Sequence, residues 1–191
     1  MIKKMPAYLA IATFVTLIIC VLLRVRQMKK LGIAAMKFGV IDKSDFILPP
    51  LMLLYFYILL AYAFGWPKVD SLWLENSLLA WLGVALCLFG LFMFIWGMVS
   101  FGQSFRVGID QKQAGKLVQE KAFAFSRNPL YLGFLSIFFG VWAILPTWFF
   151  LLYLIGAFIV INRQINREQE ALKKIYGDEY LQYMKKVRRF F

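Results

Sequence analysis

The sequence predicts an all-α, polytopic integral membrane protein with about five transmembrane helices, a C-terminal helical hairpin and an amphipathic cytosolic tail. Two observations support this fold class. Hydrophobic residues make up 62% of the 191-residue chain, whereas an ordinary soluble domain contains about 45–50% apolar residues. The positive charges cluster between apolar runs, as they do in membrane proteins with cytosolic loops. Lipid must therefore solvate much of the surface.

Five apolar segments approach the length of about 20 residues that a membrane-spanning helix requires. They comprise residues 6–23, 46–66, 78–102, 129–145 and 147–161. The first resembles a signal peptide, but Arg24 and Arg26 follow it in place of a small-residue cleavage site, so we expect it to stay attached. Pro49 and Pro50 fall in the opening turn of the second, where a missing N–H costs least.

The last two apolar segments are short for full spans, and only Pro146 separates them. As a single helix they would be far too long for one crossing, so we expect a hairpin. The sequence leaves open whether this hairpin crosses the bilayer completely.

The lysines and arginines provide an independent test of the five-span arrangement. Six lie in residues 24–43, five in residues 106–127 and eight after Asn162, and five spans bring all of these to one side. Lys3, Lys4 and Lys68 fall on the other side. The positive-inside rule makes the basic side cytosolic. We therefore expect the N-terminus outside and the C-terminus inside, in the cytoplasmic membrane of a prokaryote.

The net charge of +12 is compatible with a nucleic-acid binder or with a membrane protein that has cationic loops. The membrane interpretation is favoured, because the charges follow the topology and no recognisable nucleic-acid module accompanies them. Anionic lipid headgroups are the expected partners of four basic residues that follow the first span. These are Arg24, Arg26, Lys29 and Lys30.

The chain has no histidine, which removes the commonest general base and the commonest metal ligand, and we expect no metal. Cys20 and Cys87 both lie in apolar stretches and are interpreted as small core hydrophobes. Gly83, Gly90 and Gly97 recur at seven-residue spacing and share a helix face. This face either allows close helix packing or leaves a groove for a lipid-like substrate.

Arg127, Asn128 and Pro129 stand where a cytosolic loop enters the membrane. A residue before proline is biased away from the α conformation, and proline suits the first helical position. Taken alone, the tripeptide is therefore a plain helix start beside an interfacial arginine.

The charged segment after the last span holds Arg163, Arg167, Glu168 and Glu170. Local sequence alone allows a solvated helical continuation with ion pairs as well as a functional site. Apolar residues then recur at three- and four-residue steps, interrupted at Gly177-Asp178. We expect an amphipathic pair of short helices, the first ending at the glycine and the second capped by the aspartate.

Together, the motifs of residues 101–191 resemble the isoprenylcysteine carboxyl methyltransferase family, whose pattern is shared by membrane phospholipid N-methyltransferases. They comprise, in order, Leu117-Val118, Phe123, Arg127-Asn128-Pro129-Leu130-Tyr131-Leu132-Gly133, the apolar hairpin, Glu168, Leu172, Tyr176-Gly177-Asp178-Glu179-Tyr180, Tyr183 and Val187-x-Arg189-Phe190. The first hundred residues match only as three spans. Two positions depart from the family pattern: Asn128 replaces a histidine, and Gln169 replaces the second of two glutamates.

The resemblance implies a single membrane domain over residues 1–191, with three spans in residues 1–100 and the cofactor-binding catalytic part in residues 101–191. The implied cofactor is S-adenosylmethionine, and the implied acceptor is a lipophilic substrate from the bilayer. The implied cofactor-binding residues are Leu117, Val118, Arg127, Asn128, Pro129, Tyr131, Leu132, Gly133, Glu168 and Tyr180, and the implied catalytic residues are Glu168, Arg167 and Arg163.

The resemblance also suggests a role for each of these groups. Glu168 would hold the ammonium group of the cofactor or stabilise its sulfonium. Arg163 or Arg167 would orient an anionic substrate group, and Tyr131 and Tyr180 would pack on the adenine.

Methyl transfer from a sulfonium is an in-line displacement that depends on alignment in a dry pocket more than on acid–base catalysis. A chain without histidine can therefore catalyse it, although Asn128 cannot take up a proton at neutral pH. Methylation of a lipophilic small molecule or lipid-modified acceptor is the leading activity, and the resemblance implies the carboxylate of a prenylated cysteine as one such acceptor. N-methylation of a phospholipid amine is the alternative. A non-catalytic membrane protein retaining the fold and a small transporter subunit are further alternatives. A transporter would require ionisable groups within its spans. The five apolar segments contain no Asp or Glu, and Glu75 lies only near one of them.

Overall fold

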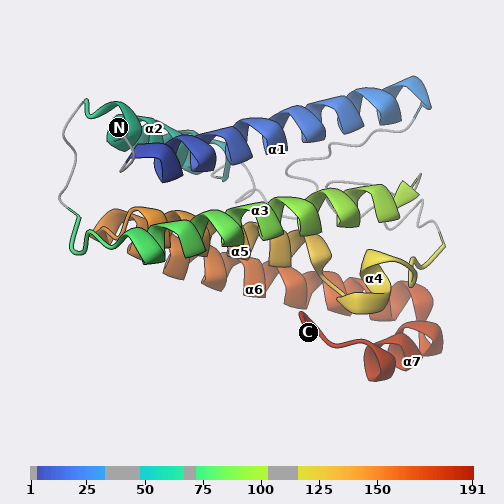
Figure 1. Ribbon diagram of the computed structural model, residues 1–191. Helices are drawn as coiled ribbons and strands as arrows, with labels where there is room; N and C mark the ends of the chain where they lie inside the picture. Colours follow the sequence, from blue (N-terminus) through green and yellow to red (C-terminus); the bar gives the residue numbers. More distant parts are fainter. Residues whose placement is uncertain (1–3, 33–47, 67–71, 103–115) are drawn as a thin grey trace.

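The computed structural model describes residues 4–32, 48–66, 72–102 and 116–191, and every regular element in these ranges is a helix. The elements are α1 (Met5–Lys30), α2 (Leu48–Phe64), α3 (Ser77–Ser100), α4 (Ala122–Phe125), α5 (Pro129–Ile144), α6 (Trp148–Tyr176) and α7 (Asp178–Lys186). The long helices lie side by side, and the short α4 and α7 gather at one end of the bundle (Figure 1). The predicted all-α membrane fold is confirmed.

Three helices are long and apolar enough to cross a bilayer, namely α1 with 26 residues, α3 with 24 and α6 with 29. The apolar helices α2 and α5 occupy the predicted positions, but with 17 and 16 residues they are shorter. A helix rises about 1.5 Å per residue, so these two are about 25 Å long against a hydrocarbon core of about 30 Å. The count of five full spans thus stays a prediction for α2 and α5.

A seam of glycines joins α3 to α5 along their antiparallel faces. A Cβ added at Gly83 would lie 2.5 Å from the carbonyl oxygen of Gly140, and one added at Gly90 would lie 2.6 Å from that of Gly133. Gly97 continues the seam against the first turn of α5. Such close backbone approach is possible only without side chains. The packing interpretation of the seven-residue spacing is therefore correct, and these glycines leave no groove.

An aromatic cluster around Tyr55 joins the remaining long helices. The ring centroid of Tyr55 lies 5.4 Å from Phe14 of α1, 5.3 Å from Phe138 of α5, and 5.1 and 4.3 Å from Phe150 and Tyr153 of α6. Tyr55 itself is fully buried in α2. Edge and offset contacts at these distances are favourable aromatic geometries. This cluster holds α2 in the bundle.

The two cysteines are free thiols within this apolar packing. Cys87 is buried, and Cys20 is half-buried against the core. Their prediction as small core hydrophobes is confirmed.

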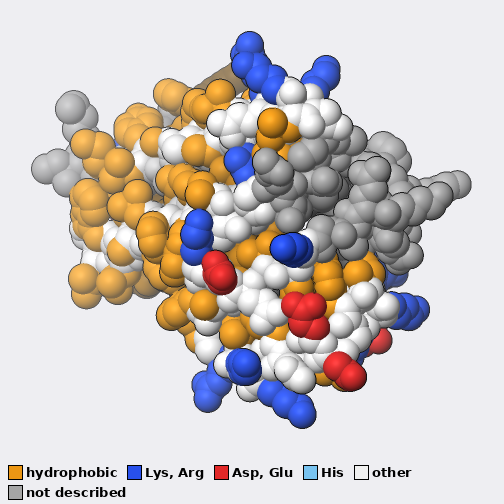
Figure 2. Space-filling view, turned by 90° about the vertical axis from the view of Figure 1, so that its right-hand side faces the viewer, with side chains coloured by type: hydrophobic (Ala, Val, Ile, Leu, Met, Phe, Trp, Pro, Cys, Tyr) orange, Lys and Arg blue, Asp and Glu red, His pale blue; other side chains and the backbone are white. Residues whose placement is uncertain are grey.

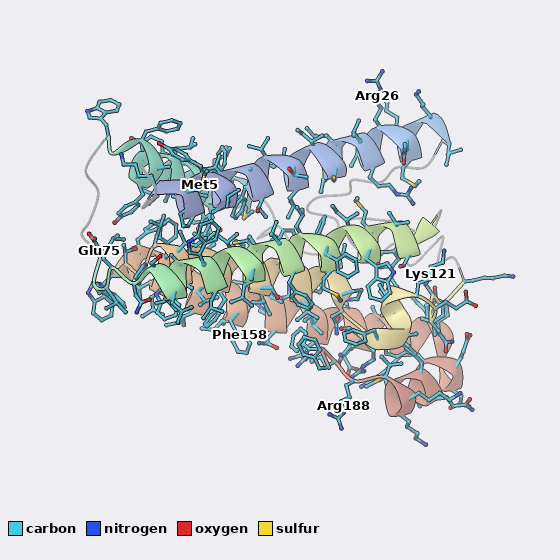
Figure 3. All side chains as sticks on the ribbon, viewed as in Figure 1. Met5, Arg26, Glu75, Lys121, Phe158 and Arg188 are labelled. Carbon is cyan, nitrogen blue, oxygen red and sulfur yellow. The ribbon has the colours of Figure 1, made fainter. Side chains whose placement is uncertain are left out.

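Contacts between described residues tie the helices together at both ends of the bundle (Figure 1). At one end the backbone N–H of Trp73 donates to the carbonyl oxygen of Pro146 at 3.0 Å, which ties the segment before α3 to the α5–α6 turn. At the other end Arg24 donates to the carbonyl oxygen of Gly102. Figure 3 shows Met5 and Glu75 at the first end and Lys121 toward the second. Figure 2 looks onto the second end, where basic and acidic side chains both gather beside apolar ones.

Parts of the predicted basic loops, and the connection that carries Lys68, lie outside the described residues. The orientation of the bundle relative to the cytosol therefore stays a prediction.

The charged tail differs from the predicted pair of short helices. The last apolar helix, α6, continues without interruption to Tyr176, because residues 162–176 are mostly strong helix formers such as Arg, Glu, Gln and Lys. The chain breaks at Gly177, whose positive φ of 53° suits glycine. Gly177 also occupies the N-cap of α7, so the prediction that Asp178 caps this helix was wrong. The four-residue helix α4 was not predicted.

Candidate active site

The polar end of the bundle brings together several groups that the sequence marks for chemistry. They come from the loop before α5, the first turn of α5, the polar half of α6, and α7 with the residues that follow it. Among them, Arg127, Tyr131, Glu168 and Tyr180 form one cluster.

Glu168 is a half-buried carboxylate held by two side chains. The hydroxyl of Tyr131 donates to its Oε1 at 2.5 Å, and Nε2 of Gln164, one turn earlier in α6, donates to the same oxygen at 3.1 Å. A hydrogen bond to an ionised acceptor is shorter and stronger than a neutral one. Glu168 is therefore a fixed group that joins α6 to α5. It is not a freely solvated acid.

Glu170 shows the contrasting situation on the same helix. It is exposed and forms an ion pair with Lys173, at 2.7 Å between Oε1 and Nζ. The interpretation of the tail as a solvated helix with ion pairs applies to this residue.

Arg127 and Tyr180 meet beside Glu168. The guanidinium of Arg127 hydrogen-bonds to the phenol of Tyr180, a buried residue of α7. Burial raises the pKa of Tyr180, the positive charges of Arg127 and Arg189 oppose that rise, and the charge of Glu168 adds to it. All three charged groups thus act on one phenol. Tyr180 lies at the centre of the cluster.

The C-terminal segment (residues 187–191) holds the start of α5 in place. The backbone N–H of Arg127 donates to the carbonyl oxygen of Arg188 at 3.1 Å. The carbonyl oxygen of Arg189 accepts two side-chain hydrogen bonds, from Nδ2 of Asn128 at 2.9 Å and from Oγ of Ser126 at 3.2 Å. The side-chain amide of Asn128 is thus hydrogen-bonded to the backbone. This buried residue links the start of α5 to the C-terminal segment.

Helix α7 is anchored on α4 by a second tyrosine. The buried Tyr183 donates its hydroxyl to the carbonyl oxygen of Phe123 at 2.7 Å. Burial raises the pKa of Tyr183, so its phenol stays protonated and keeps donating far into the alkaline range. Nε2 of Gln119 also donates to Glu179 at 2.9 Å, which ties the segment before α4 to the start of α7.

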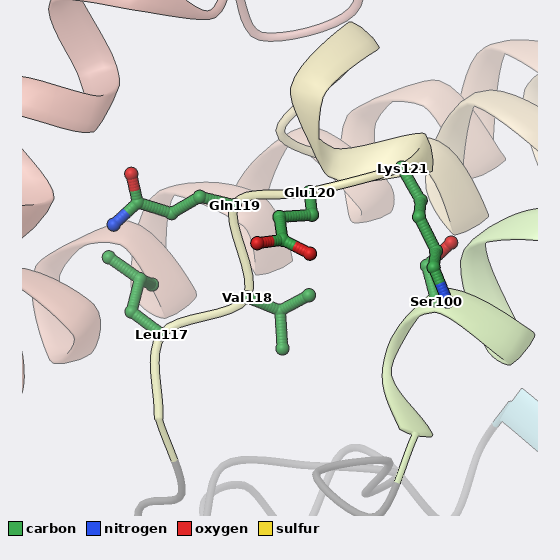
Figure 4. A pocket seen from close by; sticks show the side chains of 6 residues that line it. All are labelled: Ser100, Leu117, Val118, Gln119, Glu120 and Lys121. Carbon is green, nitrogen blue, oxygen red and sulfur yellow. The ribbon is translucent and has the colours of Figure 1, made fainter.

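A cavity of about 460 Å³ opens beside the segment before α4. Its lining residues are Ser100, Leu117, Val118, Gln119, Glu120 and Lys121. The segment is extended, so Val118 faces Ser100 while Leu117 points to the other side (Figure 4). Lys121 has a positive φ of 56°, which is strained for a residue with a side chain. The expected cofactor-binding pair Leu117 and Val118 thus lines a cavity to which no residue of the Glu168 cluster contributes.

Three other expected cofactor-binding residues are buried in α5. Gly133 packs on Gly90 and Pro129 packs on Gly97, both across the seam with α3, and Leu132 is buried as well. Their observed contacts serve to hold the first turn of α5, with Tyr131, in position.

The two arginines expected to be catalytic lie on a different face of α6 from Glu168. Arg163 is exposed and Arg167 is half-buried, and their spacing of four residues aligns them with each other. Gln164, which shares the face of Glu168, was missed, although the same four-residue spacing would have identified it. Asn166 was missed as well, and it accepts a hydrogen bond from the guanidinium of Arg189. Only the fold reveals that contact.

Within the described residues, no group of three or more His, Cys, Asp or Glu side chains could hold a metal ion. One comparison with known proteins identifies a family of membrane methyltransferases. The family described as phospholipid methyltransferase matches residues 78–179, more than half of the chain, from the start of α3 to the start of α7. No curated protein and no solved structure matches the chain.

Proposed function

Because the chain belongs to the phospholipid methyltransferase family, a family of membrane methyltransferases, we propose that it transfers a methyl group from S-adenosylmethionine to a lipophilic acceptor. The reaction would take place at the end of the bundle formed by α4, the start of α5, the polar half of α6 and α7. The acceptor would enter from the bilayer, and the cofactor would enter from the cytosol.

The observation that carries this proposal is the cluster of Glu168 with Tyr131, Arg127 and Tyr180. The amino-acid end of S-adenosylmethionine bears an ammonium and a carboxylate. A fixed, half-buried carboxylate such as Glu168 suits the ammonium, and a guanidinium such as Arg127 suits the carboxylate. The residues present therefore fit the cofactor.

The cofactor supplies a methyl group on a positively charged sulfur. The chain's own residues would bind, orient and dehydrate the reactants, which is the main requirement of an in-line displacement. Such a reaction requires no base when the acceptor is a carboxylate or an unprotonated amine. Asn128, whose Nδ2 donates to the carbonyl oxygen of Arg189, is then not required to act as a base.

The surface of α6 supports access from the membrane. Its apolar half exposes large side chains, including Phe158 and Ile159 with exposed fractions of 52% and 61%. At about 1.5 Å per residue, Glu168 lies about 14 Å further along the helix than Ile159. Lipid tails that surround the apolar half would therefore lie within about 14 Å of Glu168 along the helix axis.

Two acceptor classes are consistent with this arrangement. Carboxyl methylation of a prenylated cysteine is our leading assignment, because positively charged guanidiniums in the cluster would attract a carboxylate. N-methylation of a phospholipid amine is the second assignment, and the description of the matching family favours it.

Transfer of tritiated methyl groups from S-adenosylmethionine tests the proposal. Purified protein would be assayed with a total lipid extract and with a panel of prenylcysteine analogues. A methyl ester releases volatile label as methanol in mild base, whereas an N-methyl group keeps its label. Labelled product of either kind supports methyl transfer and identifies the acceptor class. Absence of product with every acceptor, together with no binding of S-adenosylhomocysteine, would contradict the proposal.

A further inference from the structure

Three buried hydrogen-bond donors at the cluster have no partner among the described residues. They are Nε and Nη1 of Arg127 and Nε of Arg189. A buried donor without an acceptor is costly, and native proteins rarely retain one without a reason. Both residues have other bonds that fix them, to Tyr180 for Arg127 and to Asn166 for Arg189. The unpartnered donors are therefore parts of rigidly held side chains.

The two arginines are brought together by the backbone. Arg127 donates its N–H to the carbonyl oxygen of Arg188, and the carbonyl oxygen of Arg189 accepts from the side chain of Asn128. Their guanidiniums both act on the phenol of Tyr180. Two segments separated by about sixty residues thus present two guanidiniums to one place. The separation of 61 residues between Asn128 and Arg189 means that only the folded bundle creates this pair.

The charge at this place is not balanced within the cluster. Within the part of the chain that the structure describes, Glu168 is the only acid whose charge acts on Tyr180, against the two guanidiniums. Partly buried like charges raise the free energy of the folded state unless an opposite charge accompanies them. An oxyanion would satisfy the unpartnered donors and offset the excess positive charge at once.

We propose that Arg127 and Arg189 form an oxyanion-binding subsite that takes a carboxylate or a phosphodiester. Planar guanidinium groups suit both ligands because each presents two oxygens to two N–H donors. The ligand is either the carboxylate of the cofactor's amino-acid end or the anionic group of the acceptor. The choice of these two candidate ligands, the cofactor carboxylate and the anionic group of the acceptor, rests on the proposed function. The subsite itself rests on the unpartnered donors of Arg127 and Arg189.

Binding to purified protein in detergent micelles separates the two sources. S-adenosylhomocysteine carries the amino-acid carboxylate, and methylthioadenosine retains the nucleoside and the sulfur but lacks it. If the subsite holds the cofactor, Arg189→Gln weakens binding of S-adenosylhomocysteine about tenfold to a hundredfold and leaves methylthioadenosine within about twofold. If it holds the acceptor, Arg189→Gln leaves both nucleosides unchanged and raises the KM for an anionic acceptor about tenfold.

Matched variants control for charge and folding. Lys185→Gln removes an exposed positive charge from α7. It should change the affinity neither for S-adenosylhomocysteine nor for methylthioadenosine. Arg189→Lys keeps the charge but loses the planar fork, so it should recover only part of the lost affinity. Equal losses for both nucleosides, or effects no larger than those of Lys185→Gln, would overturn the subsite.

The test also distinguishes failure of the subsite from failure of the proposed function. If the wild-type protein binds no nucleoside and transfers no methyl group, dihexanoylphosphatidate and dihexanoylglycerol provide a further comparison. The phosphate-bearing lipid should raise the melting temperature of the wild-type protein more than that of Arg189→Gln, and dihexanoylglycerol should raise neither. An equal response of wild type and variant to dihexanoylphosphatidate would then refute the subsite independently.

Discussion

Replacing Gly90 by alanine should force α3 and α5 apart. The added Cβ would lie 2.6 Å from the carbonyl oxygen of Gly133, whereas the closest favourable C···O contacts measure about 3.3–3.6 Å. The helices must therefore separate by about 0.7–1 Å at this point. Overpacking of this kind costs about 1–3 kcal/mol, and the higher helix propensity of alanine offsets about 0.5–1 kcal/mol of that cost. We expect a net loss of about 1–2 kcal/mol in the free energy of unfolding.

Gly156 provides the matched control, because a Cβ added there would meet nothing within 4 Å. Gly156→Ala should therefore be neutral or stabilise α6 by up to about 1 kcal/mol. Both variants would be unfolded by titrating SDS into mixed micelles while tryptophan fluorescence reports the transition. If the unfolding midpoints of Gly90→Ala and Gly156→Ala shift in opposite directions or by clearly different amounts, the close packing of α3 on α5 at Gly90 is supported. Indistinguishable shifts for Gly90→Ala and Gly156→Ala would refute the reasoning.

Three further predictions concern the polar end of the bundle. Tyr131→Phe removes one of two hydrogen bonds to Glu168, so affinity for S-adenosylhomocysteine should fall about twofold to tenfold in a calorimetric titration; unchanged affinity would mean that this bond does not shape the site. Tyr183→Phe leaves a buried carbonyl oxygen of α4 unpaired and should cost about 1–3 kcal/mol of stability. Because burial raises the pKa of Tyr183, this contribution is present below the ordinary phenol pKa and is lost as pH rises through the folded value, so the variant and the wild type should converge in strong alkali. In intact cells, a cysteine placed at Lys185 should be protected from a membrane-impermeant thiol reagent and one placed at Trp66 should react; the reverse pattern would overturn the predicted orientation.

The packing of the membrane helices was predictable from local patterns in the sequence. The seven-residue spacing of Gly83, Gly90 and Gly97 indicates a close helix contact, and the structure provides the matching glycines of α5. The start of α5 at Pro129 also follows from local conformational preferences. Both features depend on residues within one or two helical turns of each other, where sequence patterns are most informative.

The contacts of the candidate site were not predictable in the same way. The sequence singled out Tyr131 and Glu168 separately, but the bond between them joins residues 37 positions apart and depends on how α5 and α6 pack. The partner of Asn128 is a backbone carbonyl 61 residues away, which no side-chain pattern encodes. The boundary at Gly177 was recognised, but the helix before it is one continuous element, because helix propensity persists where the apolar pattern ends.

The affinity of Glu168→Gln for S-adenosylhomocysteine, compared with that of Glu170→Gln, tests the central claim most directly. Both changes are isosteric, but Glu168 is half-buried in the cluster and Glu170 is exposed beside Lys173. If Glu168 binds the ammonium group of the cofactor, Glu168→Gln should weaken binding about tenfold to a hundredfold, the scale of a hydrogen bond to a charged group. Glu170→Gln should bind like the wild type, and the melting temperatures of both variants should barely change. Equal, small effects at the two positions would contradict the assignment of the cluster as the cofactor site.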